Sequence, residues 1–166
     1  LVTEKLPLLC NSQILTSQDL LTSKHLSRLV SMARQALVLA KRYDVVVANP
    51  PYLGKKGMNP ALKGFLGSAF PLGQSDLFSA FTLRCLKWRK SDTCSVSLVT
   101  PFNWMFLPSF QSFREALLDS CFLSSLVELE ANAFEPAMVT VCAFVLRTLV
   151  SGQAKGCYVR LSDFKG

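Results

Sequence analysis

The architecture of this protein follows from one short segment of its sequence, Asp44-Val45-Val46-Val47-Ala48-Asn49-Pro50-Pro51-Tyr52. The first half of the segment is β-branched and continuous rather than alternating, which is typical of a strand covered on both faces of its sheet. The two prolines lack a backbone N–H, so they cannot continue the hydrogen bonds of a sheet. The segment therefore predicts a buried strand over 44–48 that ends in a rigid turn.

Periodic patterns on both sides of this strand predict the other elements. Apolar residues at spacings of three and four indicate a helix over 26–41, at Leu26, Leu29, Val30, Ala33, Leu37 and Ala40. Further helices are expected over 60–67, 76–90 and 109–119, and further strands over 94–99, 122–129, 139–149 and 158–161. This order predicts an α/β fold, with a mostly parallel sheet, helices on both faces and an antiparallel hairpin at the end.

Length and composition limit the class of protein. The 166 residues fit one domain, which we place at 26–166 after an irregular lead-in over 1–25. Half of the residues are hydrophobic and 17% are charged, which excludes a disordered chain. The sequence has no apolar run long enough for a membrane span and no secretory signal. Because it also lacks an initiator Met, we expect a piece of a longer, cytoplasmic protein.

The cysteines and the histidine do not form a recognisable site. The six cysteines include no Cys-x-x-Cys pair, and the single histidine, His25, is near none of them. We therefore expect no metal site, and we expect buried thiols in a reducing cytoplasm.

The turn after the first strand carries chemistry of its own. In an α/β sheet, ligands bind beyond the carboxyl ends of the strands, which is where Asn49 to Tyr52 lie. Pro50 and Pro51 keep their carbonyl groups, and Asn49 adds a side-chain acceptor. Two acceptors that converge on one amine would favour a tetrahedral nitrogen with a free lone pair, and the ring of Tyr52 offers a surface for a planar base.

These residues resemble motif IV of the DNA methyltransferases that make N6-methyladenine. The resemblance continues through Gly57-Met58-Asn59-Pro60-Ala61-Leu62-Lys63, Ser75-Asp76-Leu77-Phe78 and Trp104-Met105-Phe106-Leu107. These flanks are similar to the large adenine-specific methyltransferases of BREX phage-exclusion systems, the PglX type, and to fused type II restriction–methylation enzymes. The similarity runs from about residue 27 to residue 148, and it implies part of a Rossmann-like methyltransferase domain, namely its C-terminal half.

The resemblance also implies roles for individual residues. Asn49 and the carbonyl of Pro50, held by Pro51, would bind the amino group of an adenine flipped from double-stranded DNA, and Tyr52 would stack on the base. Phe134 would be a second stacking aromatic residue. Asn49 and Asp76 would line the pocket of the cofactor, S-adenosylmethionine.

The sequence departs from the family at the cofactor site. The family binds S-adenosylmethionine through a glycine-rich turn upstream of motif IV, whereas residues 1–43 contain no glycine. We therefore expect the upstream methyltransferase segment and the downstream target-recognition domain to lie outside this chain. Strand 44–48 would then have lost a neighbour and would form an open apolar edge.

Several residues have two readings. Lys55, Lys56 and Lys63 are either solvated loop charges or contacts to DNA phosphates, and the net charge of +7 only suggests nucleic acid. Asp76 is either a helix N-terminal residue or part of the site. The aromatic residues Phe102, Trp104 and Phe106 belong either to the core or to a rim around an extruded base.

Three functions remain open on this basis. The first is a site-specific adenine-N6 DNA methyltransferase, in phage defence or restriction–modification. The second is a methyltransferase that uses the same tetrapeptide on protein glutamine or on RNA. The third is a non-catalytic remnant that binds DNA or a partner.

Overall fold

The structure is a computed structural model that describes residues 20–91, 93–129, 140–148 and 155–161. The chain divides into two compact units, Leu1–Arg42 and Tyr43–Gly166. The division follows the first described helix, whereas the sequence predicts a boundary near residue 25. The residues predicted as the lead-in lie outside the described part up to residue 19, and 20–25 are helical.

The described part of the first unit is a single helix, α2, from Leu20 to Ala40. It begins before the predicted start at residue 26, because the preceding Leu20 to His25 segment contains neither glycine nor proline to break a helix. Its half-buried residues include Leu26, Val30, Ala33 and Leu37, which follow the predicted stripe. Leu29, also assigned to that stripe, is 60% exposed.

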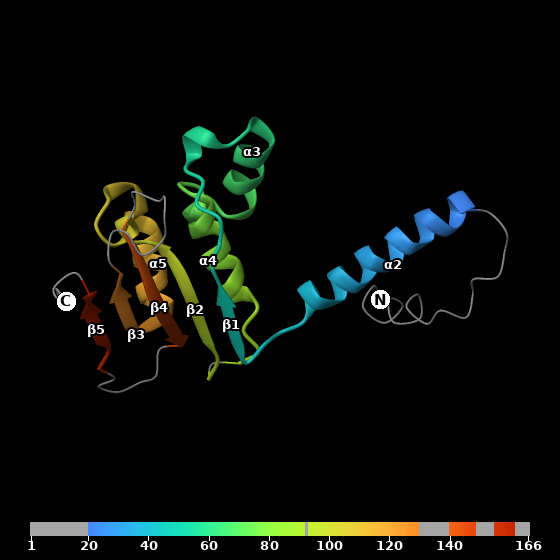
Figure 1. The fold of residues 1–166 in the computed structure, drawn as a ribbon. Coiled ribbons are helices and arrows are strands. Elements are labelled where there is room, and N and C mark those ends of the chain that lie inside the picture. The colour runs from blue at the N-terminus through green and yellow to red at the C-terminus, as the bar shows by residue number, and fades with distance from the viewer. Residues whose placement is uncertain (1–19, 92, 130–139, 149–154, 162–166) are drawn as a thin grey trace. The chain divides into compact units, whose positions relative to one another are not determined.

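The second unit is built on a five-stranded sheet (Figure 1). Its strands are β1 (Val45–Ala48), β2 (Ser95–Pro101), β3 (Cys121–Glu128), β4 (Val141–Thr148) and β5 (Cys157–Arg160). The spatial order is β1-β2-β4-β3-β5. β1 is parallel to β2 and β5 is parallel to β3, whereas β4 runs antiparallel to both β2 and β3. The antiparallel β3–β4 pairing confirms the predicted terminal hairpin.

In the part of this unit that the structure describes, three α-helices connect the strands. They are α3 (Pro60–Ala69), α4 (Leu77–Lys87) and α5 (Gln111–Ser120), and four short 3-10 turns lie at Lys55–Gly57, Pro71–Gly73, Phe102–Met105 and Pro108–Phe110. α3 begins as predicted, because the side-chain oxygen of Asn59 accepts a hydrogen bond from the amide of Leu62 at 2.8 Å. Its fixed first residue, Pro60, suits the first helical turn.

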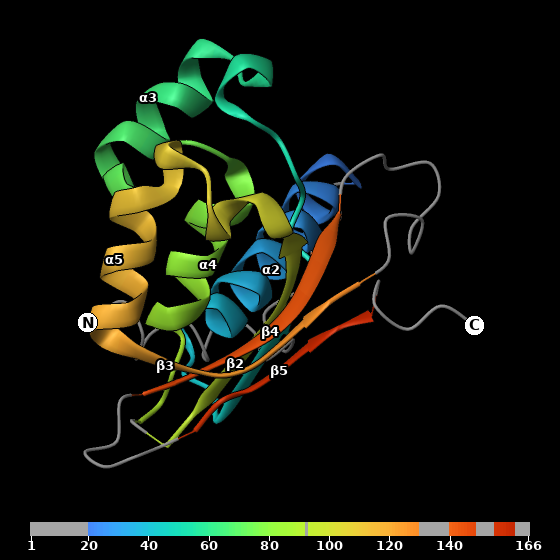
Figure 2. The same cartoon turned by 90° about the vertical axis from the view of Figure 1, so that its left-hand side faces the viewer.

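The two helices that pack on the sheet, α4 and α5, lie on the same face (Figure 2). The α/β class is therefore confirmed, but the prediction of helices on both faces does not hold within this unit. The reason is the direction of the connections. β1 to β2 and β2 to β3 both advance the same way along the sheet, so crossovers of one handedness place both helices on one side.

The core of the unit lies between these helices and the sheet. Its largest fully buried side chains include Phe78 from α4, Trp104 from the segment after β2 and Phe113 from α5. The Trp104 ring packs at 5.8 Å from that of Phe113 and at 5.1 Å from that of Phe144 on β4. Phe81 on α4 lies outside this core and is 37% exposed.

The opposite face of the sheet carries apolar residues that are only half-buried, among them Val99, Val127 and Val145. β1 lies at the edge of the sheet, where Val45 is 60% and Val47 is 74% exposed. This arrangement matches the open apolar edge expected for strand 44–48. Of the described cysteines, four are buried as expected, and only Cys157 is exposed.

Candidate active site

The Asn-Pro-Pro-Tyr turn lies at the carboxyl end of β1, where the sequence places it. The parallel register pairs Ala48 with Leu98, so Asn49 follows beside the last part of β2. Pro50 is buried, whereas Asn49 and Pro51 are exposed. The turn thus presents the amide of Asn49 at the surface while the first proline anchors the backbone.

Tyr52 folds back onto the turn that it ends. Its hydroxyl donates to Oδ1 of Asn49 at 3.0 Å and lies 3.3 Å from the carbonyl oxygen of Val99 on β2. Its ring meets that of Phe78 edge-on, with 6.4 Å between the centroids and 87° between the planes. Burial raises the pKa of the Tyr52 phenol, and the nearby Cys142 thiol adds to the shift, so the hydroxyl stays a donor.

This contact orients the side-chain amide of Asn49. A carbonyl oxygen has two lone pairs, so Oδ1 of Asn49 can accept one hydrogen bond from Tyr52 and one more from another donor. The hydroxyl also selects the amide orientation in which the oxygen, and not the NH2 group, lies beside the ring. The site is therefore suited to a ligand that donates N–H groups.

Asp76 ties the turn to the start of α4. Its Oδ1 accepts from the amide of Leu53 at 3.0 Å and from the amide of Phe78 at 3.2 Å. Backbone hydrogen bonds support the same junction, from Leu77 N to Leu53 O at 3.0 Å and from Lys55 N to Ser75 O at 3.1 Å. Asp76 is thus the N-cap of α4, as one of the two readings predicts, and it also holds the residue that follows Tyr52.

The aromatic segment after β2 divides between the two readings. Trp104 is 1% exposed, and its indole N–H donates to Oγ1 of the buried Thr100 at 3.1 Å, so it belongs to the core. Phe106 is 62% exposed, and its ring packs against the half-buried Phe102 at 5.9 Å. Only Phe102 and Phe106 therefore remain available as a rim.

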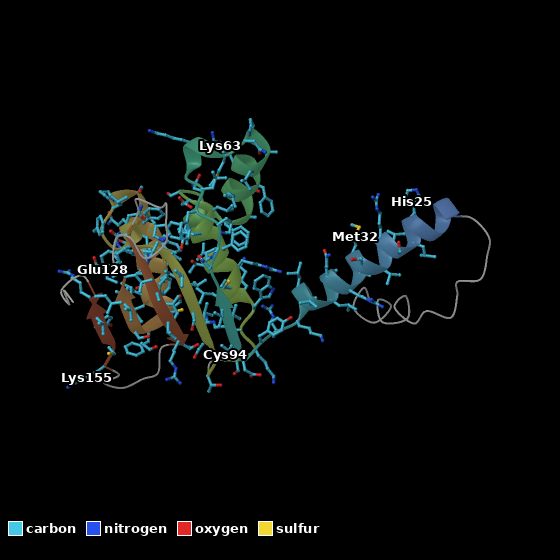
Figure 3. The ribbon with its side chains drawn as sticks, viewed as in Figure 1. His25, Met32, Lys63, Cys94, Glu128 and Lys155 are labelled. Carbon is cyan, nitrogen blue, oxygen red and sulfur yellow. The ribbon has the colours of Figure 1, made fainter. Side chains whose placement is uncertain are left out.

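The three lysines lie on the segments that follow the turn. All three are exposed, and Nζ of Lys55 donates to Oε1 of Gln74 at 3.1 Å. Figure 3 shows Lys63 on α3 and Cys94 at the opposite end of the sheet. Phe134, the expected second aromatic residue, lies outside the described residues.

Sequence reasoning missed three contributions. The first two are the carbonyl of Val99, which lies 47 positions after Tyr52 in the sequence, and the amide of Leu53, which lies 23 positions before its acceptor Asp76. Arg114 on α5 donates to the carbonyls of Trp104 and Leu107 at 2.7 and 2.8 Å, and so fixes the aromatic segment. Of the three, only Arg114 could have been suspected from the sequence, because it is a cation near the start of the helix that follows the aromatic segment. Oδ1 of Asn103 in that segment is buried and has no partner among the described residues.

Neither metal ligation nor membrane insertion is seen in the part of the chain that the structure describes. No group of three or more His, Cys, Asp and Glu side chains comes together there to hold an ion. None of the helices found there combines the length and the apolar character needed to cross a bilayer.

Comparison with known proteins assigns the family. Residues 8–134 match the Eco57I restriction-modification methylases, and this range includes β1, the turn, α4 and the aromatic segment. The chain belongs to the Eco57I restriction-modification methylase family.

Two curated relatives are much longer than this member of the family. The adenine-specific methyltransferase BrxX of Escherichia coli O9:H4 (strain HS) is 37% identical over 148 residues, which are 87% of this chain and 12% of that protein. The adenine-specific methyltransferase PglX of Lacticaseibacillus casei (strain Zhang) is 33% identical over 143 residues, which are 84% of this chain and 12% of that protein. This chain thus spans about an eighth of the length of these two relatives.

Solved structures identify the fold. A protein from Listeria monocytogenes assigned as a class I S-adenosylmethionine-dependent methyltransferase superposes with a TM-score of 0.59 and 15% identity, over 83% of this chain and 47% of that one. The five-stranded sheet is therefore part of a class I methyltransferase fold.

The sequence upstream of β1 bears on the expected cofactor site. The first glycine in the sequence is Gly54, so no glycine-rich turn precedes β1. The acceptors on Asn49 and Val99 that meet the Tyr52 hydroxyl suit a group that donates N–H or O–H. The part of the chain that the structure describes therefore does not include the glycine-rich turn expected to hold S-adenosylmethionine.

Proposed function

We propose that this chain carries the amine-binding side of the active site of a site-specific, adenine-N6 DNA methyltransferase that acts in phage defence or restriction–modification. The observation that carries the proposal is the hydrogen bond between the hydroxyl of Tyr52 and Oδ1 of Asn49 at the carboxyl end of β1. It leaves one acceptor position on Oδ1 of the exposed Asn49. The names of BrxX and PglX, both adenine-specific methyltransferases, supply the chemical class.

The residues of the turn would act by positioning. Oδ1 of Asn49 and the carbonyl of Pro50 accept the two hydrogens of the exocyclic amine, while Pro51 keeps the backbone rigid. The lone pair of the amine nitrogen is then freed from conjugation with the ring, and it points away from the two acceptors. S-Adenosylmethionine supplies an electrophilic methyl group in this reaction class. The ring of Tyr52 stacks on the base, which must first be flipped out of double-stranded DNA at a cost of a few kcal/mol.

The decisive test is the Asn49→Ala variant in a full-length protein that contains this chain. We expect methylation of DNA to fall by a factor of about a hundred or more, since acceptor removal in a preorganised site has this effect. Gln111→Ala removes an exposed amide from α5 and serves as the control with normal activity. Full activity of Asn49→Ala, in a variant with normal circular dichroism, would refute the proposed role of the turn.

The substrate class is tested with the same preparation. Tritiated methyl transfer is measured to double-stranded DNA, to RNA and to a protein that carries an exposed glutamine. We expect label in DNA, on N6 of adenine. Label only in RNA or in protein would favour the second function that the tetrapeptide allows.

One observation favours a second candidate for the isolated chain, a binding module without activity. Because no glycine precedes β1, we propose that a glycine-containing upstream segment holds S-adenosylmethionine and that a downstream domain recognises the target sequence. Calorimetric titration of the 166-residue chain with S-adenosylmethionine should give no saturable binding. Micromolar binding by this chain alone would show that residues 1–43 or the sheet form a cofactor site of another kind.

We propose DNA phosphate contacts for Lys55, Lys56 and Lys63, and a stacking role for Phe134. The three lysines follow the turn in sequence, and Lys56 and Lys63 are exposed. Lys63→Glu should weaken DNA binding and reduce the slope of log K against log salt by about one. Lys155→Glu, at the far end of the sheet in Figure 3, is the matched control. If Lys63→Glu and Lys155→Glu weakened DNA binding equally, Lys63 would contribute only to non-specific attraction between the protein and DNA.

Asp76 is assigned to positioning rather than to cofactor contact. Its Oδ1 already accepts from two amides, and the first of them belongs to the residue after Tyr52. The carboxylate thus sets the place of the stacking ring, through the backbone.

A further inference from the structure

A hollow of about 650 Å³ lies between α3 and α4, outside the proposed active site. Its walls are mostly apolar, and they include the large side chains of Phe65, Phe70, Leu77 and Phe81. Phe65 is 56% exposed and Phe81 is 37% exposed, so the hollow presents aromatic surface to solvent. Exposed apolar surface that is grouped in this way marks an interaction site more often than scattered residues do.

The charge at the hollow has one sign. Arg84 and Lys87, one turn apart on α4, are the charged residues among the described residues that line it, and none of the described lining residues is Asp or Glu. Both cations are placed by aromatic rings. The guanidinium of Arg84 lies 4.8 Å from the centre of the Trp88 ring, and the ammonium of Lys87 lies 5.1 Å from that of Phe70. These contacts hold the two charges beside the apolar walls and reduce the entropy lost when an acidic group binds.

The geometry of the walls selects the shape of a ligand. The α4 wall uses positions 77, 80, 81, 84 and 87 and the α3 wall uses positions 62, 65, 66 and 69, so each is one helical face. The α4 face is about 15 Å long, from the ten residue-to-residue steps between Leu77 and Lys87 and the rise of 1.5 Å per residue. Helical walls offer no unpaired backbone groups to an extended peptide, whereas a third helix satisfies its own backbone and can pack its side chains between theirs.

We propose that this groove, lined by α3 and α4, docks an acidic amphipathic α-helix of a partner protein. The apolar face of the helix fills the space between Phe65 and Phe81. Its carboxylates pair with Arg84 and Lys87 at the rim. The groove is separate from the Asn-Pro-Pro-Tyr turn, so docking and methylation are distinct properties of the protein.

The test uses a fluorescein-labelled peptide of about 15 residues, with leucine at i, i+3, i+4 and i+7 positions and glutamate elsewhere. We expect saturable anisotropy with the 166-residue chain, with a dissociation constant on the order of 10 μM. A scrambled peptide of the same composition, and one with lysine in place of glutamate, should bind at least tenfold more weakly. Equal binding of either would overturn the proposal.

Variants locate the binding. Phe81→Ser and the double variant Arg84→Glu/Lys87→Glu should each raise the dissociation constant more than tenfold. The control, Arg147→Glu/Lys155→Glu, makes the same change of charge at exposed residues far along the chain and should alter it less than twofold. Because Phe81 is partly exposed, its substitution leaves the core intact, and circular dichroism verifies this. A similar loss in the control would show non-specific charge attraction.

Three further outcomes would also overturn the proposal. Binding to phosphatidylglycerol vesicles that Phe81→Ser abolishes would assign the groove to a lipid surface. A dimer seen by sedimentation and lost in Phe81→Ser would assign it to a second copy. The third outcome concerns Phe65→Cys in a full-length protein that contains this chain. If maleimide cannot label the introduced thiol, another part of that protein already covers the groove.

Discussion

Replacing Asp76 with alanine is expected to destabilise the second unit by about 2–4 kcal/mol. The carboxylate accepts two amide hydrogen bonds, from Leu53 and Phe78. Loss of a helix N-cap costs about 1 kcal/mol. The part-buried amide of Leu53 loses its partner as well, which costs about 1–3 kcal/mol more. The sum of the two gives the expected range.

Asparagine at the same position separates the acceptor from the charge. Asp76→Asn keeps an oxygen where Oδ1 accepts both amides, so we expect a loss of less than about 1 kcal/mol. Asp119→Ala removes an exposed carboxylate from α5 and should change stability by less than about 0.5 kcal/mol. Urea denaturation of the 166-residue chain, followed by circular dichroism, measures all three variants.

Kinetics of the full-length protein then test whether Asp76 positions the turn. If the carboxylate holds the residue after Tyr52 in place, Asp76→Ala lowers kcat much more than it raises the KM for DNA, because ground-state contacts to DNA remain. Asp76→Asn should restore most of kcat. The proposed role of Asp76 would be refuted if Asp76→Ala destabilised the protein by less than about 0.5 kcal/mol, or if Asp76→Asn and Asp76→Ala changed stability and kcat equally.

Three further outcomes follow from the described contacts. Gly73→Ala should destabilise the protein by about 1–3 kcal/mol, because a Cβ there would lie 2.8 Å from the backbone of α4. Gly64→Ala should stabilise α3 by up to about 1 kcal/mol, since nothing lies within 4 Å of its Cβ. Thermal melts compare the two variants. Because the folded pKa of Tyr52 is raised above 10.0, its contribution to stability is complete below pH 10 and is lost as the pH rises through the folded value; urea melts between pH 9 and 12 should show this fall, and Tyr52→Phe should lack it. In a Cys10→Ser background, Ellman's reagent should modify Cys157 rapidly and the buried thiols only after unfolding; fast reaction of more than one thiol would contradict the burial.

Local pattern predicted most elements but not how they are ordered in space. The β-branched run before Asn49 predicts β1, and the Asn59-Pro60 pair predicts the start of α3, because each signal lies within a few residues of the element. The position of β4 between β2 and β3 depends on pairings such as Ser95 with Arg147, which no local pattern contains. The common face of α4 and α5 follows from that order, so it was not predictable either.

The candidate site shows the same limit. Asn49 and Tyr52 are visible in the sequence because an Asn-Pro-Pro-Tyr turn after a β-branched run is an unusual combination. The contact of Tyr52 with Val99 and that of Asp76 with Leu53 are not visible, because they join segments far apart in the chain. The 37% exposure of Phe81 is not visible either, because a periodic pattern shows which residues share a helical face but not whether a partly open groove adjoins that face.

The strand order has a consequence for synthesis of the protein. β4 lies between β2 and β3 in the described sheet, yet it follows both of them in the sequence and leaves the ribosome after them. Until residues 141–148 emerge, β2 and β3 each lack the neighbour that separates them in the finished sheet. The facing edges of β2 and β3 therefore stay unpaired in the nascent chain until β4 is made. Unpaired strand edges favour aggregation, so chaperones should matter during this interval.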